Sequence, residues 1–201
     1  MKKALRVVGF LLLALAVAGA GVYAWASRKA GQKLAQKYTI HTADFPIPFP
    51  LNADEVRRLK LRPGAADSAA RQRALERGQH LVESRYACRE CHGKNFAGGV
   101  MVDAAPVGHL FGPNLTNGKG SRVSHYRAAD WDRAVRHGVR PDGTPLVMPS
   151  QDFRNLTDQE LSDVVVYIQS QAPIDQTMPR ATLGPILKVM TATGLPVGLA
   201  P

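Results

Sequence analysis

The two cysteines of the chain, Cys88 and Cys91, are three residues apart, and His92 follows directly after the second. Two thiols at this spacing fall on one helical turn. Four kinds of site use such residues: a disulfide, a zinc site, a thioredoxin-like redox pair and a covalently attached haem. A disulfide would leave His92 without a role. The sequence has no second Cys or His pair to complete a zinc site, and no βαβ pattern to carry a redox pair.

Haem attachment gives all three residues a role, because each thiol can form a thioether with the porphyrin edge while the imidazole binds the iron. One axial position of the iron then needs a ligand. The downstream candidates are Met101, His109, His125, His137, Met148 and Met178. Met148 is favoured because it lies in the irregular stretch "PLVMPS", where Pro149 fixes the backbone beside it. Its structural alternative is a gap-filling core methionine, and His109, near glycines, is the main rival ligand.

Three helices are expected to position these residues. Apolar spacing predicts helices over residues 68–84 and 128–137, and the capping box "TDQE" at 157–160 begins a third. No clear strands are visible between them. The segments 93–126 and 138–156 are long and irregular, which is unusual in a compact domain. This pattern predicts that something other than protein fills the space they enclose.

The N-terminus carries an uncharged apolar stretch of 21 residues, from Val7 to Ser27. At ~1.5 Å per residue it can cross a bilayer core of ~30 Å, with Tyr23 and Trp25 placed for an interfacial aromatic belt. A cleaved signal peptide ending at Ala24-Trp25-Ala26 is the alternative. We favour an uncleaved anchor, because the apolar region of a signal peptide normally runs only ~7–15 residues. Either way, the remainder of the chain is expected to be exported.

The formal net charge is +10 among 201 residues, but the positive charge is unevenly distributed. Residues 28–65 carry eight basic side chains against three acidic ones, whereas residues 68–175 carry thirteen against twelve. The excess therefore lies beside the membrane segment, where basic side chains favour anionic head groups. This distribution argues against nucleic-acid binding.

Two segments flank the expected helices. In the first, prolines at positions 46, 48 and 50 predict an extended and fairly stiff spacer. It could equally pack on the domain as an arm, with the alternating Phe45, Ile47 and Phe49 as its buried face. In the second, residues 176–201 are apolar but broken by Gly and Pro, so they are expected to form an arm on the domain or a patch for a partner.

Residues 70–175 resemble the class I c-type cytochromes, in particular membrane-anchored bacterial ones. "RGQHLVESRYACRECHG" is similar to the first helix and haem-binding turn, "GPNLT" to the loop after the haem, "DWDRAVRHGVRPDGTPLVMPS" to the middle helix and axial methionine, and "LTDQELSDVVVYIQS" to the closing helix. The resemblance implies that the carbonyl of Pro113 accepts a hydrogen bond from His92 and that Gly78 meets Tyr167 where the first and last helices cross. It also places Trp131 near the haem edge, although a plain core tryptophan is the alternative.

The chain departs from the family in two places. Arg127 and Ala128 stand where a Ser, Thr or Asp should cap the middle helix, and residues 94–111 form a longer connection than in compact mitochondrial members.

The expected fold is therefore all-α: a cytochrome c-like haem domain preceded by a single transmembrane helix and a proline-rich spacer. The expected divisions are the anchor (1–28), the spacer (29–67), the haem domain (68–175) and the apolar arm (176–201).

The expected cofactor is one covalently attached haem c, bound by Cys88, Cys91, His92 and Met148. Because His plus Met saturates the iron, the chain is expected to carry single electrons rather than to catalyse a reaction. It would lie on the periplasmic side of a bacterial cytoplasmic membrane and exchange electrons with redox proteins, freely or within a larger oxidoreductase. The alternative function is a haem enzyme or gas sensor with a displaceable sixth ligand.

Overall fold

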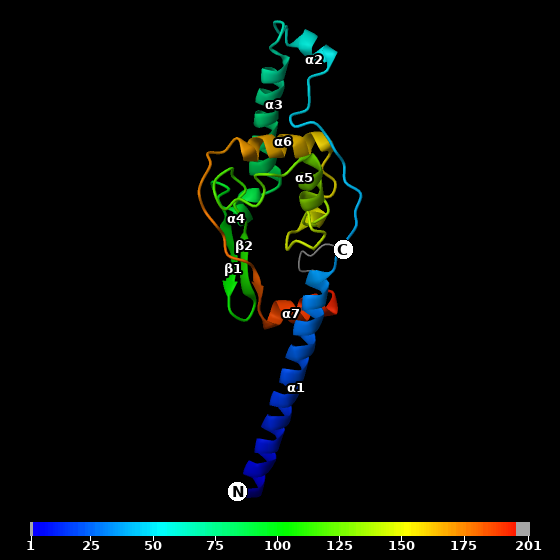
Figure 1. The fold of residues 1–201 in the computed structure, drawn as a ribbon. Helices are drawn as coiled ribbons and strands as arrows, with labels where there is room; N and C mark the ends of the chain where they lie inside the picture. Colours follow the sequence, from blue (N-terminus) through cyan, green and yellow to red (C-terminus); the bar gives the residue numbers. More distant parts are fainter. Residues whose placement is uncertain (1, 196–201) are drawn as a thin grey trace.

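One long helix, α1, projects from a domain built by the rest of the chain, in a computed structural model that describes residues 2–195 (Figure 1). The helices are α1 (Lys2–Ala35), α2 (Ala53–Arg58), α3 (Ala66–His80), α4 (Cys88–His92), α5 (Ala128–Val135), α6 (Asp158–Gln169) and α7 (Pro185–Thr193). The strands are β1 (Gly99–Ala104), β2 (Gly108–Gly112) and β3 (Thr182–Leu183). A π-helical turn, Leu81–Arg85, continues α3, and a 3-10 turn, Ser150–Asp152, precedes α6.

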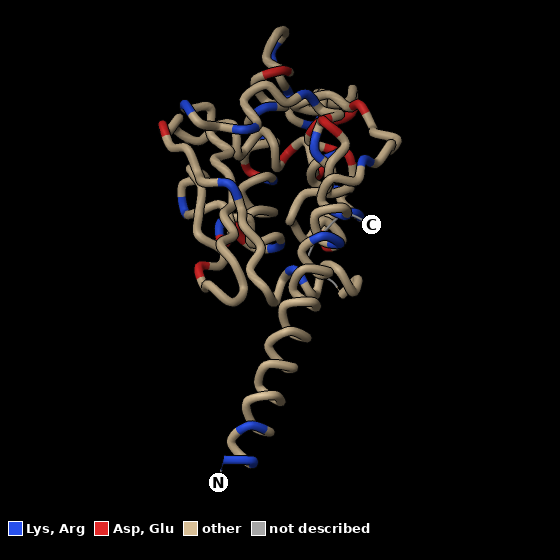
Figure 2. Tube along the Cα trace, turned by 60° about the horizontal axis from the view of Figure 1, so that its bottom comes forward, with Lys and Arg blue, Asp and Glu red and all other residues tan. Residues whose placement is uncertain are grey.

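The helix α1 is exposed over most of its length and is long and apolar enough to cross a membrane. Figure 2 shows an uncharged stretch between basic residues at its two ends. A helix apolar on all sides has no polar face to turn to water, which suits a lipid environment. The predicted long apolar N-terminal helix is thus present, and it continues past the apolar stretch to Ala35.

The frame of the domain is the crossing of α3 and α6, as Figure 1 shows. At the crossing point, a Cβ on Gly78 would run into the carbonyl of Asp163 and lie 2.8 Å from the Cβ of Tyr167. Only glycine allows the two backbones to approach so closely. The predicted meeting of Gly78 and Tyr167 is confirmed.

The core lies between this crossing and α5. Its members are the buried side chains of Phe45, Leu81, Val82, Phe96, Leu115, Val123, Ala128, Trp131, Leu161, Val164, Val165, Tyr167 and Ile168. The capping box predicted at the start of α6 is present, because Thr157 Oγ1 accepts a hydrogen bond from the Glu160 backbone and Glu160 accepts one from Thr157 N–H. The middle helix begins at Ala128 without the usual cap. Instead, the Asp130 carboxylate accepts a hydrogen bond from Arg127 N–H.

The all-α prediction is incomplete, because the described residues include a three-stranded antiparallel sheet ordered β1-β2-β3. The long connection between haem turn and Pro113 forms the β1–β2 hairpin, and β3 adds two residues at its edge. The backbones of Gly99 and Gly112, which pair across the hairpin, pack directly on Cys91. The strands were missed because a register shift between Val100 and Val102 breaks their alternation.

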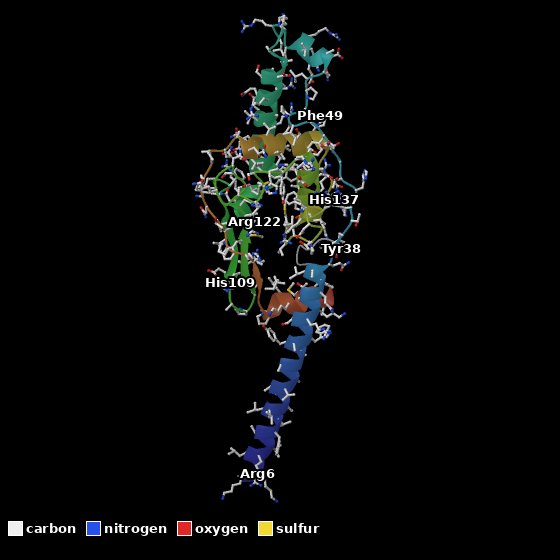
Figure 3. The ribbon with its side chains drawn as sticks, viewed as in Figure 1. Arg6, Tyr38, Phe49, His109, Arg122 and His137 are labelled. Atoms are coloured by element: carbon white, nitrogen blue, oxygen red, sulfur yellow. The ribbon has the colours of Figure 1, made fainter. Side chains whose placement is uncertain are left out.

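The proline-rich spacer packs on the domain as an arm. Phe45 is buried in the core, and Phe49 stacks on it with ring centroids 6.4 Å apart. Ile47 lies partly buried against the same cluster, so the alternating apolar face is confirmed. Backbone contacts fasten the arm further, because Ala43 N–H donates to Asp132 and Pro46 C=O accepts from Ser162. Figure 3 shows Tyr38 at the lower end of this arm and Phe49 near α6.

The apolar C-terminal segment forms β3 and α7, and α7 packs on α1. It was predicted as an arm interrupted by Gly and Pro. In the described part, Pro185 instead stands in the first turn of α7 and Gly194 ends it with φ +83°. These are favourable positions for both residues, because Pro lacks only an N–H that would be unpaired and Gly tolerates a positive φ. Residues 196–201 of the predicted arm lie outside the described residues.

Candidate functional site

A cavity of about 1360 Å³ opens between α4, α5 and the loop before α6. It exceeds the ~300–1,000 Å³ of ordinary ligand pockets. All six predicted site residues line it: Cys88, Cys91, His92, Pro113, Trp131 and Met148. The long irregular segments do enclose a space that protein atoms leave open.

The helical turn α4 presents both thiols to this cavity. The chain enters the turn through Ala87 with φ +46° and leaves it through Gly93 with φ +78°. Both cysteines are free, so no disulfide joins them. Burial raises the pKa of the Cys88 thiol to about 11 and also raises the pKa of Cys91. The thiols are therefore neutral, and their surroundings do not stabilise the thiolate on which a redox pair depends.

The ring of His92 is held by the loop after β2. Its Nδ1 lies 3.0 Å from the carbonyl oxygen of Pro113. Because a carbonyl only accepts, Nδ1 carries the proton and Nε2 is left with a lone pair. Burial lowers the pKa of His92, and the hydrogen bond to Pro113 opposes this effect. A neutral imidazole with a free Nε2 is the form that binds a metal.

The opposite wall is aromatic and aliphatic. Trp131 on α5 is 3% exposed, and Tyr126 packs edge-on against it at 5.5 Å between centroids. Further apolar lining includes Leu115, Val123, Ala134, Val135, Leu146, Val164 and Ile168. This lining suits a large, flat, apolar ligand.

One buried polar atom in the cavity lining has no hydrogen-bond partner among the described residues. The indole Nε1 of Trp131 is buried without a hydrogen bond among the described residues. An orphaned buried donor costs about 1–3 kcal/mol. Arg122 and Arg140 also line the cavity, and burial lowers the pKa of Arg140. Donors and cations beside an apolar hollow fit haem, whose ring is apolar and whose periphery carries carboxylates.

Comparison with known proteins agrees with this geometry. The family described as "Cytochrome C oxidase, cbb3-type, subunit III" matches residues 73–168. Residues 73–168 are thus similar to a class I c-type cytochrome domain. Domains of this kind bind haem c.

Relatives of the cytochrome domain are subunits of dehydrogenases. The "Fructose dehydrogenase cytochrome subunit" of Gluconobacter japonicus is 29% identical over 124 residues, which cover 58% of this chain and 25% of the relative. The "Gluconate 2-dehydrogenase cytochrome c subunit" of Pantoea cypripedii is 31% identical over 118 residues, covering 55% and 26%. The "Alcohol dehydrogenase (quinone), cytochrome c subunit" of Gluconacetobacter polyoxogenes is 33% identical over 78 residues, covering 38% and 16%. The chain thus spans about a quarter or less of the length of these relatives.

The candidate sixth ligands of the iron differ in whether they line the cavity. Met101, His125 and Met148 line the cavity. His109 does not; it lies on the hairpin, where its Nδ1 is 2.6 Å from Asp103 Oδ1 (Figure 3). His137 follows the end of α5 and does not line the cavity; its Nε2 lies 3.5 Å from Asp132 Oδ2. Met178 packs instead beside Gly98 and accepts a hydrogen bond from Gln176.

Four residues near the site were missed by sequence reasoning. Arg122, Tyr126 and Arg140 reach the cavity from loops whose paths no local pattern reveals. Arg89 lies between the two cysteines and donates a hydrogen bond of 2.7 Å to the hydroxyl of Tyr167. It also lies 3.1 Å from the Glu83 carboxylate, so the haem turn is tied to α6 and to the end of the first helix. Its position inside the motif was the one signal that could have drawn attention to it.

Proposed function

We propose that this chain is a membrane-anchored cytochrome that carries single electrons through one covalently attached haem c. The observation that carries the proposal is the cavity that brings Cys88, Cys91 and His92 together with Met148 from another segment. When bound there, haem c supplies a one-electron redox couple. Residues of the chain would hold it: both cysteines as thioethers, with His92 Nε2 and the Met148 sulfur as axial ligands.

The surrounding residues would tune this site. Pro113 fixes the ring orientation of His92 and raises its basicity through the hydrogen bond at Nδ1. Trp131 lines the cavity, and its indole N–H, which has no partner among the described residues, would be available to a polar group of the cofactor. Two axial ligands leave no position for oxygen or peroxide, so the cavity serves electron transfer and not substrate chemistry.

The N-terminal helix would remain uncleaved as the membrane anchor. The chain would then divide into the anchor (1–28), the spacer (29–67), the haem domain (68–175) and the apolar arm (176–201). Cleavage after Ala26 would remove Tyr23, whose hydroxyl lies 2.8 Å from Lys188 Nζ on α7. It would also cut α1 within its contact with α7, where Ala26 and Ala30 are buried. An uncleaved helix keeps this packing. Thioether attachment follows export, so the haem domain would face the periplasm of a bacterial cell with the N-terminus inside.

The electron donor would be a dehydrogenase in the same membrane. This rests on the relatives, whose names describe cytochrome subunits of dehydrogenases for sugars, sugar acids and alcohols. The chain would act as the cytochrome subunit of such a complex, or as the carrier that accepts its electrons.

Optical spectra of the exported protein with haem attached test the proposal. The oxidised wild type should show the weak far-red band of a methionine–iron bond, and Met148→Ala should abolish it. Met101→Ala is the matched control, because Met101 lines the same cavity from β1 and should leave the band unchanged. Loss of the band in Met101→Ala, or ready carbon monoxide binding by the wild type, would contradict the ligand assignment.

A further inference from the structure

The C-terminal helix α7 is fastened to α1 at the level where α1 leaves its apolar stretch (Figure 1). Ala26 and Ala30, one helical turn apart, are 0% and 2% exposed. Lys188 lies over the ring of Tyr23 at 4.6 Å from the centroid and donates a hydrogen bond to its hydroxyl. Two small residues allow close packing of the helices, and the Lys–Tyr pair fixes their relative height.

This contact sets the depth of α7 relative to a bilayer. The apolar stretch of α1 ends at Ser27, and the first charge after it is Arg28. Tyr23 lies five residues before Arg28, or ~7 Å deeper along the helix axis at ~1.5 Å per residue. Helices that lie flat in a membrane bury their apolar side ~5–10 Å into the boundary between head groups and acyl chains. A helix held at Tyr23 is therefore at interfacial depth.

The tip of the β1–β2 hairpin is joined to the start of α7. Ile186 N–H donates to the carbonyl of Pro106 at 2.9 Å, and Gly184 N–H donates to the carbonyl of Val107 at 2.8 Å. The tip reads Ala104-Ala105-Pro106-Val107, without charge, and Ala105 and Pro106 are exposed. The hairpin tip and α7 thus form one continuous surface beside α1.

This surface is apolar although it is exposed. Outside α1, the exposed large hydrophobic side chains among residues 2–195 are Leu59, Val100, Ile186 and Leu195. Ile186 lies in α7 and is 47% exposed, and Leu195 follows it and is 54% exposed. The one charged residue of α7 is Lys188, which can extend its ammonium to the head groups while its stem stays in apolar surroundings.

We propose that the hairpin tip (104–107) and α7 form a membrane-contact face, which rests in the lipid interface of the bilayer that α1 spans. The inference depends on the proposed anchoring, because α1 sets the depth. Lipid is the occupant that the structure favours, since this face continues directly from the exposed apolar surface of α1.

The contact would hold the haem cavity at the membrane surface. Arg180 and Ala181, which lead into β3 and α7, line the cavity. The cofactor would therefore lie just above the head groups, in a fixed orientation, where a partner embedded in the same membrane can reach it.

Lipid contact can be measured with a fluorescent thiol label on the full-length, haem-loaded chain in nanodiscs. Ile186→Cys and Ala105→Cys place the label on the proposed face, and Asp67→Cys places it on α3, at the opposite end of the domain (Figure 1). Each variant is compared in ordinary and brominated lipid. The chain without an added cysteine provides the blank, because thioether formation consumes both native thiols.

Brominated lipid should reduce the fluorescence at positions 186 and 105 about twofold, as expected for labels at interfacial depth, and leave position 67 unchanged. Equal fluorescence in both lipids at 186 and 105 would overturn the proposal and indicate a surface that faces water or a protein partner. The intact mass separates this failure from failure of the anchor. A mass lacking residues 1–26 would show that the anchoring itself is wrong, whereas a full mass without quenching overturns only the membrane-contact face.

Discussion

Asp163 on α6 places a carboxylate that is 1% exposed against the first helix of the domain. Arg77 on α3 donates two hydrogen bonds to it, from Nε at 2.6 Å and from Nη2 at 2.9 Å, and this pairing raises the pKa of Arg77. Only Gln159 is a further side-chain partner of this carboxylate among the described residues. Arg77→Ala would therefore leave a buried carboxylate poorly compensated. It should lower the free energy of unfolding by about 1–3 kcal/mol, because Arg77 is itself 37% exposed and water can enter the vacated site.

Guanidinium unfolding of the detergent-solubilised protein, followed by circular dichroism, measures this loss. Arg77→Lys is the matched control, because it keeps the charge but cannot reproduce the two-point contact, and should lose less stability than Arg77→Ala. Equal stability of Arg77→Ala and the wild type would show that the pair contributes little.

The close packing of α3 on α6 depends on Gly78. Gly78→Ala would place a methyl group against the Asp163 carbonyl and 2.8 Å from the Tyr167 Cβ, so α3 and α6 would have to separate. Overpacking of this kind costs typically ~1–3 kcal/mol, although alanine is the better helix former. Arg71→Ala, on the exposed side of α3, is the control and should change stability by less than about 0.5 kcal/mol. Unfolding midpoints of both variants test the expectation, and a Gly78→Ala protein as stable as the control would contradict it.

The elements that could be predicted from the sequence are those with local signals. The capping box at Thr157 and the apolar spacing after it predict a helix that begins where α6 does. The helix α2 has an equally clear box, in which Asn52 and Glu55 cap each other's backbone, and it was overlooked inside the proline-rich spacer. The helix α7 was missed for another reason. Its flanking Pro185 and Gly194 were interpreted as interruptions, whereas they mark its two ends.

The residues of the candidate site also differ in whether a local sequence signal predicts them. The haem turn is local, because Cys88, Cys91 and His92 share five residues, and family resemblance supplies Pro113, Trp131 and Met148. Arg122 and Arg140 could not be predicted, because the direction of a loop side chain depends on tertiary packing that no spacing in the sequence encodes.

At the scale of the whole molecule, the domain is held to α1 from two sides. The C-terminal helix α7 packs on α1 directly. On the other side, the arm between α1 and α2 runs up the domain, where Tyr38 N–H donates to the Gly143 carbonyl at 2.9 Å and Ala43 N–H donates to Asp132 at 2.8 Å. Two attachments restrict the swing that a single linker would allow, so the orientation of the haem site relative to the membrane depends on both.

Phe45 is the apolar anchor of this arm, because it is 7% exposed, stacks on Phe49 and lies 5.7 Å from the Arg136 guanidinium. Phe45→Ala removes a buried aromatic side chain, a change that costs about 3–5 kcal/mol in a core. We expect the arm to detach before the domain unfolds, since most of its backbone groups have no partner in regular secondary structure.

Hydrogen–deuterium exchange followed by mass spectrometry resolves this order of events. In Phe45→Ala, exchange should accelerate across residues 38–50, including the amides of Tyr38 and Ala43 that lose their acceptors, while the amides of α6 stay protected. Pro50→Ala, at an exposed position of the same arm, should leave the pattern unchanged. Equal acceleration in the arm and in α6 would mean that the arm and domain unfold as one cooperative unit, in which case the arm is part of the domain core and not a detachable fastening.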